Sequence, residues 1–338
     1  MFESQPKISV ILPFYNANKT ILRAVLSIKN QTFTNFECIL VDNNSTDDSK
    51  AIVQTIVDSD HRFKLVSEKK QGVTFASNKG WETSTGEYIA RMDADDWSHP
   101  TRLEKQNDFL DSNPDYGAVG TLVNHMSHSE YTGGMARFVE WSNSLTTYDQ
   151  ICKNRFIELP IVNPTAMWRR QVAAENGMYL DGNFPEDYEM WLRWLDKGVK
   201  IGKIKEVLLD WYDSDNRLSR THKIYSDKLF YKIKTKYLAD WLEKNNPFHP
   251  KVAIWGASKI SRRRAKLLEE HCIEICCYID TKNNKRQIDK EVHFFKNIPS
   301  PETIFVLTYI KQREAREATR AFLIKKGYNE SENFLVVS

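Results

Sequence analysis

The sequence lacks any apolar run that approaches the roughly 20 residues needed to cross a bilayer. Its first residues, 1–7, also lack the charged and then apolar plan of a signal peptide. Cysteine is scarce, with 5 in 338 residues, and these five form no CxxC pair. The absences argue against a disulfide framework and a zinc site, and they predict a cytoplasmic protein with reduced thiols.

An excess of charge of one sign is missing as well. The 48 Lys and Arg residues against 45 Asp and Glu residues give a net charge of +3, and apart from the local cluster at 262–264 the basic residues are spread out. We therefore expect no nucleic-acid partner. What is present is a globular composition, 41% hydrophobic, in a chain long enough for two domains.

Short apolar runs alternate with longer amphipathic segments in the first third of the chain. The expected strands are 8–12, 37–41 and 63–66, and the expected helices are 19–30, 45–58 and 73–82. This alternation predicts an α/β fold whose mainly parallel sheet is covered on both faces. Ligands bind beyond the carboxyl ends of the strands in such sheets, so the polar residues that follow each strand are candidates for a site.

A further strand, 87–92, ends in the acidic segment 93–96 (DADD). In extended backbone Asp93 and Asp95 point the same way and can both reach one cation. Mg²⁺ or Mn²⁺ held by one or two carboxylates takes its other ligands from substrate phosphates, which points to a nucleoside-diphosphate substrate. The alternative is a polar turn that caps the next helix.

Two other carboxylates follow predicted strands. Asp42 comes directly after the run 37–41 and can accept a hydrogen bond from a pyrimidine ring N–H, or it can satisfy the backbone of its own loop. Glu68, which precedes Gly72, occupies the same kind of position after 63–66 and is equally ambiguous alone.

Taken together, the motifs form an ordered set over residues 5–220. They are VILPFYN at 10–16, VDNNSTD at 41–47, Glu68 with Gly72, NKG at 78–80, GEY at 86–88 and RMDADD at 91–96. This set resembles the family 2 inverting glycosyltransferases of the GT-A fold. The resemblance implies a nucleotide-sugar donor and a bound divalent cation.

The resemblance also assigns residues to that donor. It implies that Asp42 binds the base and that Asp93 and Asp95 lie at the ribose and the metal-bound diphosphate. The remaining donor-binding residues that it implies are Pro13, Tyr15, Asn16, Glu68, Asn78 and Arg91.

Inversion by direct displacement needs a base that deprotonates the acceptor hydroxyl. The segment 184–194 (FPEDYEMWLRW) offers Glu186 and Asp187 in a predicted first helical turn, with Asp187 on the apolar face. Partial desolvation there would raise the pKa of Asp187. The alternative is that both carboxylates only complement the helix dipole. The resemblance implies that Asp187 is the base and that Glu186 orients the acceptor or its own helix end.

Two departures from the family pattern concern positive charge. No Arg precedes the NKG motif, so Lys79 and Arg91 are candidates for the charge that faces the diphosphate. The family's Arg-x-His is replaced by Tyr212 and Ser214. The candidates to substitute for it are Arg217, Arg220 and His222, unless the metal and the leaving group are handled differently.

The rest of the chain predicts an acceptor half and a second domain. Five tryptophans in the middle region suggest an adaptable lining for the acceptor site: Trp141, Trp168, Trp191, Trp194 and Trp211. The expected domains are a GT-A domain (1–217), a helical linker (218–248) with one long helix over 218–244, and a small Rossmann-like domain (249–338).

The small domain keeps only the first glycine of a GxGxxG pattern, at Gly256. Nucleotide or phosphosugar binding stays open for it, as does a docking or homodimer role.

The sequence thus predicts a metal-dependent inverting glycosyltransferase. We expect a UDP-sugar donor and a hydroxyl acceptor on a glycan or lipid-linked glycan, in surface-polysaccharide or glycoconjugate biosynthesis. The helix over 218–244 is a candidate for peripheral contact with the inner face of the membrane. The alternatives are a non-catalytic nucleotide-sugar-binding or scaffolding protein and a sugar-phosphate nucleotidyltransferase, although the loop 13–18 is not the glycine-rich basic loop that the latter needs.

Overall fold

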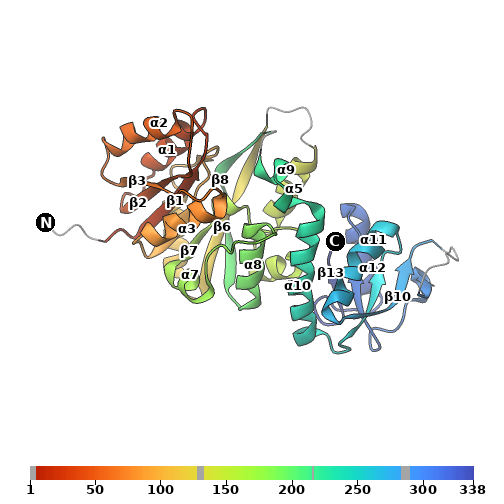
Figure 1. The fold of residues 1–338 in the computed structure, drawn as a ribbon. Coiled ribbons are helices and arrows are strands. Elements are labelled where there is room, and N and C mark those ends of the chain that lie inside the picture. The colour runs from red at the N-terminus through yellow and green to blue at the C-terminus, as the bar shows by residue number, and fades with distance from the viewer. Residues whose placement is uncertain (1–4, 128–132, 215–216, 283–289) are drawn as a thin grey trace. The chain divides into compact units, whose positions relative to one another are not determined.

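A computed structural model describes residues 5–127, 133–214, 217–282 and 290–338. The chain forms two compact units (Figure 1). The first comprises Met1–Ile151 and Pro160–Lys223, and the second comprises Cys152–Leu159 and Ile224–Ser338. The expected division at residues 217 and 248 stays a prediction, and the long helix of the expected linker belongs by its contacts to the second unit.

The elements as far as Tyr225 belong to the first unit, apart from residues 152–154 and 224–225, which belong to the second. In order they are β1 (Ile8–Phe14), α1 (Ile21–Lys29), β2 (Phe36–Asp42), α2 (Ser49–Val57), β3 (Phe63–Ser67), α3 (Val73–Thr83), β4 (Tyr88–Arg91), β5 (Trp97–Ser98), α4 (Arg102–Ser112), β6 (Tyr116–Ser127), α5 (Gly133–Ser144), α6 (Tyr148–Asn154), η1 (Asn163–Thr165), β7 (Met167–Arg169), α7 (Arg170–Asn176), α8 (Glu186–Asp196), β8 (Lys200–Asp213), α9 (Leu218–Thr221) and η2 (Lys223–Tyr225).

Within the described residues, the first unit is built on one eight-stranded sheet in the order β3-β2-β1-β4-β7-β6-β8-β5. β1 pairs in parallel with β2 and β4, and β2 pairs in parallel with β3, as the strand–helix alternation predicts. β7 runs antiparallel between β4 and β6, so the sheet is mixed beyond β4. The parallel half places four strand ends at one edge.

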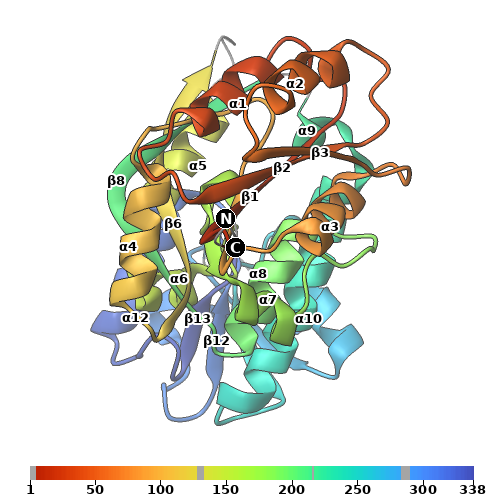
Figure 2. The same cartoon turned by 90° about the vertical axis from the view of Figure 1, so that its left-hand side faces the viewer.

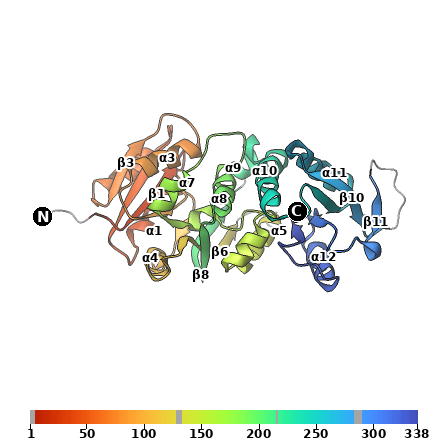
Figure 3. The ribbon, with the colours of Figure 1, turned by 90° about the horizontal axis from the view of Figure 1, so that it is seen from below.

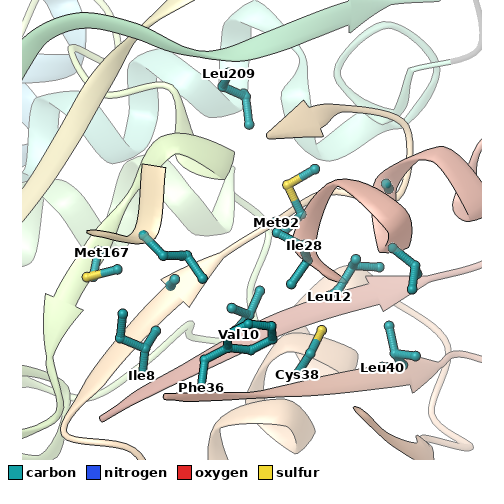
Figure 4. Packing of buried hydrophobic residues seen from close by; sticks show 14 of the residues in the cluster. Ile8, Val10, Leu12, Ile28, Phe36, Cys38, Leu40, Met92, Met167 and Leu209 are labelled. Atoms are coloured by element: carbon teal, nitrogen blue, oxygen red, sulfur yellow. The ribbon is translucent and has the colours of Figure 1, made fainter. Parts of the chain in front are cut away.

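Apolar side chains fix the helices on both faces of this parallel half. α1 and α2 cover one face and α3 covers the other (Figure 2). Alternate residues of β1, among them Val10 and Leu12, lie with Cys38 and Leu40 of β2 and with Ile28 of α1 in one buried cluster (Figure 4). Strands buried on both faces read as continuous apolar runs, which is why the sequence reveals them clearly.

Besides residues 152–159, the second unit contains the long helix and the elements that follow it. Its elements are α10 (Asp227–Asn245), β9 (Lys251–Trp255), α11 (Lys259–Ala265), η3 (Lys266–His271), β10 (Glu274–Asp280), β11 (Val292–Phe294), η4 (Phe295–Asn297), β12 (Phe305–Thr308), α12 (Arg313–Lys325) and β13 (Phe334–Val336).

All recorded pairings in the second unit are parallel, and the strand order is β11-β10-β9-β12-β13. α11 and α12 lie on opposite faces of this sheet (Figure 3), as right-handed crossovers that run outward in both directions from β9 and β12 require. A second parallel α/β unit is therefore confirmed, and its Rossmann-like identity stays a prediction.

Two expectations are wrong. The single helix over 218–244 is interrupted: backbone at His222 and Ser226 is extended, with ψ of 136° and 145°, and this separates α9, η2 and α10. The middle tryptophans are core residues rather than a lining, since Trp168, Trp191 and Trp194 are at most 1% exposed and pack edge to face. Burial of their large apolar area stabilises the core, so these side chains do not line an acceptor site.

No helix among the described residues is long and apolar enough to cross a membrane.

Candidate active site

The predicted donor residues follow strands that end at the same edge of the first sheet. Phe14 pairs with Asp42, and Asp42 pairs with Ser67, so the loops after β1, β2 and β3 begin side by side. Glu68 N–H donates to the Asp42 carbonyl over 2.9 Å. Sequence periodicity and parallel pairing thus suffice to bring these loops together.

Asp42 and Glu68, which are both predicted to face the nucleoside, also accept hydrogen bonds from the backbone of their own loops. Asp42 Oδ1 accepts the Ser45 N–H at 3.0 Å, and Glu68 Oε1 accepts the Lys70 N–H at 2.7 Å. Asp42 can therefore support its loop and also bind a base, because the hydrogen bonds among described residues use one of its two oxygens.

Asn16 adopts a positive φ of 47° and accepts the Thr46 N–H at 2.8 Å, which joins the first two loops. Tyr15 is half exposed, whereas Pro13 is buried within β1. Tyr15 is therefore the predicted nucleoside residue of this loop whose ring is accessible to a ligand.

Asn43 is a structural residue of this edge that the sequence analysis missed. Its Oδ1 accepts the Gly72 N–H at 2.7 Å, and its Nδ2 donates to the carbonyls of Glu68 and Lys70 at 3.0 and 2.8 Å. One side chain thereby fixes the loop after β3 on the end of β2. The available signal was an Asn that directly follows a strand-end carboxylate, a residue type that bonds loop backbone.

The acidic segment forms a three-carboxylate cluster. Oxygens of Asp93, Asp95 and Asp96 all lie within 4.8 Å of one another. The segment is a turn, with Asp96 N–H 3.4 Å from the Asp93 carbonyl, and not the extended backbone from which the sequence argument began. The turn explains why Asp96 joins the cluster, which strand alternation could not predict.

Asp93 is held by a buried arginine. Arg91 Nε and Nη2 donate to Asp93 Oδ1 at 2.9 and 2.7 Å, and Arg91 Nη1 donates to Ser77 Oγ at 2.6 Å. Burial acts to lower the pKa of Arg91, but Asp93, Tyr179 and Glu186 together outweigh it and the pKa is raised. Arg91 therefore stays charged and fixes one oxygen of Asp93.

The other two carboxylates are deeper. Burial, and after it the charge of Asp93, raises the pKa of Asp95. Burial raises the pKa of Asp96 well above its ordinary value, and Asp95 and Asp93 add to this. Asp96 Oδ1 accepts the Tyr212 N–H at 3.0 Å, while its buried Oδ2 has no protein partner. An unpartnered buried carboxylate oxygen beside two others fits a hard divalent cation.

Arg102 lies beneath this cluster and was also missed. Its side chain is fully buried and donates to the carbonyls of Arg91 and Pro164 at 3.1 and 2.5 Å. Burial lowers its pKa to about 10, against the opposing effect of Asp96. The guanidinium is still charged at neutral pH and partly balances the acidic cluster.

Asp187 lies in the first turn of α8, as expected. Burial, helped by the charge of Asp93, raises its pKa to about 6 against the lowering effects of the Tyr188 N–H and of Arg91. Asp187 Oδ1 accepts that N–H at 2.7 Å. The expected desolvation is confirmed, and the electrostatic coupling shows that Asp187 is close to the Arg91–Asp93 pair.

Two predicted residues surround this carboxylate. Glu186 is 6% exposed, and its charge acts on Arg91 and on the buried Tyr179. Asn78 donates from Nδ2 to the Tyr179 carbonyl at 2.8 Å, and its buried Oδ1 has no protein partner. Asn78 thus contacts Tyr179, on which the charges of Asp187 and Glu186 also act.

The end of β8 closes the other side of the cluster. The Arg23 guanidinium of α1 lies 3.5 Å from the centre of the Tyr212 ring, and its Nη2 donates to the Asp95 carbonyl. Nothing in the local sequence of α1 indicates this role, because the contact joins segments about 190 residues apart.

In the second unit, the polar groups of the loop that begins at Gly256 are occupied by its own hydrogen bonds. Ser258 Oγ accepts the Ser261 N–H at 3.1 Å, and Ser261 Oγ donates to the Tyr309 carbonyl at 2.9 Å. Gly256 has a φ of 126°, and a Cβ there would lie 3.0 Å from both Ser261 Oγ and the Tyr309 carbonyl oxygen. Both serine hydroxyls thus form hydrogen bonds with groups of the second unit itself.

Comparison with known proteins gives a consistent result. Residues 9–177 match the family described as Glycosyl transferase family 2. An uncharacterized glycosyltransferase of Haemophilus influenzae is 30% identical over 248 residues, which cover 72% of this chain and 76% of the relative. The uncharacterized glycosyltransferase MJ1057 of Methanocaldococcus jannaschii is 28% identical over 261 residues, 75% of this chain and 87% of the relative.

Two solved structures share the fold at low identity. Staphylococcus aureus TarS 1-349 in complex with UDP-GlcNAc gives a TM-score of 0.56 at 17% identity, over 79% of this chain and 71% of that one. The mannosyltransferase PcManGT from Pyrobaculum calidifontis, in complex with GDP-Man and Mn²⁺, gives a TM-score of 0.52 at 17% identity, over 80% and 74%.

Proposed function

Since the chain belongs to glycosyl transferase family 2 and has the GT-A fold, we propose that this glycosyltransferase moves a sugar from a nucleoside-diphosphate donor to an acceptor hydroxyl with inversion. The observation that carries the proposal is a carboxylate with a pKa of about 6, Asp187, coupled electrostatically to Asp93 of the three-carboxylate turn. A base and a diphosphate site side by side are what direct displacement requires.

In the proposed reaction the acceptor oxygen bonds to the anomeric carbon of the donor sugar. Asp187 takes the hydroxyl proton, the bond from that carbon to the diphosphate oxygen breaks, and its electron pair leaves with the nucleoside diphosphate. Glu186 orients the acceptor or the helix end. A partly buried carboxylate suits the role because its raised pKa makes it a stronger base.

Donor binding is proposed for the residues of the sheet edge. Asp42 and Glu68 offer their second oxygens to the nucleoside, and Tyr15 offers an exposed ring. Asn78 offers its unpartnered Oδ1, whereas Pro13, Asn16 and Arg91 shape or hold these loops. UDP-GlcNAc on TarS and GDP-Man on PcManGT support a nucleotide-sugar donor, and we propose UDP as the nucleotide.

The cation site would be formed by Asp93, Asp95 and Asp96, and Mn²⁺ in the PcManGT complex supports a divalent ion. When bound, Mg²⁺ or Mn²⁺ supplies positive charge for the departing diphosphate. We propose a glycan or lipid-linked glycan as the acceptor.

Calorimetric titration with UDP and with GDP, with and without Mn²⁺, tests the proposal. We expect Mn²⁺-dependent binding of UDP that the double change Asp93→Ala with Asp95→Ala abolishes. The matched control replaces two exposed carboxylates, Asp58→Ala with Glu82→Ala, and should bind like the wild type. Preference for GDP would replace UDP with GDP as the nucleotide of the proposed donor. No binding of either nucleotide would overturn the proposal.

A further inference from the structure

The diphosphate of the proposed donor needs positive charge from the protein, and the two residues suggested first are ill suited. Arg91 already directs its donors to Asp93 and Ser77 and is 4% exposed. The Lys79 ammonium lies 4.0 Å from Glu82 on the exposed side of α3. The cation that faces the leaving group must come from elsewhere.

Arg217 has the required position. Its guanidinium lies 4.0 Å from the centre of the Trp211 ring, and its Nη1 donates to the Tyr212 carbonyl at 3.3 Å. Tyr212 in turn donates its N–H to Asp96 of the acidic cluster at 3.0 Å. Among described residues the Arg217 guanidinium makes the one hydrogen bond to the Tyr212 carbonyl, so its other N–H groups are available for phosphate oxygens.

The neighbouring basic residues are placed differently. Arg220 Nη2 donates to the buried Asp213 at 2.6 Å, and its Nη1 donates to the Ser214 carbonyl at 2.8 Å. His222 ends α9 and its N–H donates to the Leu218 carbonyl. The hydrogen bonds thus join Arg217 to the acidic cluster through Tyr212, whereas they join Arg220 to Asp213.

Tyr212 connects Arg217 to the cluster. Its N–H donates to Asp96, its carbonyl accepts from Arg217, and its ring lies against Arg23, which donates to the Asp95 carbonyl. Because all three groups of Tyr212 are engaged, the ring and the backbone hold Arg217 and the acidic turn in one fixed arrangement.

We propose that Arg217 binds the diphosphate of the donor and stabilises the charge that develops on it as the sugar leaves, and that Arg23 is a positioning residue for the acidic turn. The inference rests on the proposed function, since it assumes a nucleoside-diphosphate donor.

The test compares nucleotides with nucleosides in calorimetric titrations. Wild type, Arg217→Gln, Arg217→Lys and the surface control Lys223→Gln are titrated with UDP, GDP, uridine and guanosine in Mn²⁺. For the diphosphate that the wild type binds, we expect Arg217→Gln to weaken affinity about tenfold or more, with affinity for the matching nucleoside unchanged. Arg217→Lys should recover part of the loss, and Lys223→Gln should bind like the wild type.

Two results would overturn the assignment of Arg217. One is an unchanged diphosphate affinity in Arg217→Gln. The other is an equal loss for diphosphate and nucleoside, which would indicate a role in folding the loop only. Failure of the wild type to bind either diphosphate would instead contradict the proposed function, so the two failures are distinguishable.

Discussion

Arg91 donates two hydrogen bonds, at 2.9 and 2.7 Å, to the same oxygen of Asp93. This geometry holds the carboxylate by Oδ1 and keeps Oδ2 outside the ion pair, where it can serve a cation. A strand-end arginine and a turn carboxylate thus combine into one rigid ligand.

Removal of the Arg91 side chain should make the protein less stable to unfolding. The side chain is 4% exposed, so Arg91→Met leaves Asp93 without its counter-charge and Ser77 Oγ without its donor. We expect the free energy of unfolding to fall by about 3 kcal/mol, measured by urea denaturation. Lys79→Met, at an exposed position on α3, should stay within about 0.5 kcal/mol of the wild type. A similar effect of both changes would contradict this account of Arg91.

Replacement of the proposed base should affect chemistry and spare donor binding. Asp187→Asn keeps an acceptor for the Tyr188 N–H but cannot take a proton. We expect kcat to fall by about a factor of 10³, within the range for general bases, with the Kd for UDP unchanged. Asp181→Asn, at an exposed position that pairs with Lys70, is the control. Activity near the wild-type level in Asp187→Asn would exclude it as the base.

The pH profile should report the same carboxylate. A base must be ionised, and the pKa of Asp187 is raised by burial to about 6. We therefore expect kcat/KM to rise about tenfold per pH unit below pH 6 and to level off above it. The measurement is initial rate between pH 4.5 and 8. A flat profile between pH 5 and 7 would show that Asp187 does not limit the reaction.

Ionisation of Asp187 should also lower the stability of the folded chain. Its pKa is higher in the folded chain, about 6 against an ordinary 3.8, so the folded state binds the proton more tightly and stability falls as pH rises from about 4 to 6. Asp187→Asn removes this cost. We expect the variant to be more stable than the wild type by about 3 kcal/mol at pH 7 and equal to it near pH 4, by urea denaturation. Equal stability at both pH values would argue that the carboxylate is solvated.

Gly80 permits the close approach of α3 to the sheet. A Cβ at this position would lie 2.4 Å from Ile11 Cγ2 of β1 and 3.3 Å from Val41 Cγ2 of β2. Gly80→Ala should therefore lower the free energy of unfolding by about 2 kcal/mol, with displacement of α3 and weaker activity. Gly134→Ala, in α5 with no atom within 4 Å of its Cβ, should be neutral or stabilising. Thermal melts of both variants decide the comparison.

The sequence determined those features of this protein that depend on local periodicity. Continuous apolar runs specified β1 and β2, and parallel strands end at one edge, so the placement of Asp42, Glu68 and Asp93 follows from the order of residues alone. The ordered motifs also identified the family correctly. The helix face of Asp187 predicted the direction of its pKa for the same reason, because i, i+3 and i+4 spacing fixes which neighbours surround it.

Only the tertiary structure decided which charges meet. The turn at 93–96, and not strand alternation, brought Asp96 into the cluster, and burial placed the middle tryptophans in the core. Arg23 reaches Tyr212 from a segment far away in the chain, and no local pattern encodes such a contact. Electrostatic interactions depend on distance and burial, which a linear sequence does not contain.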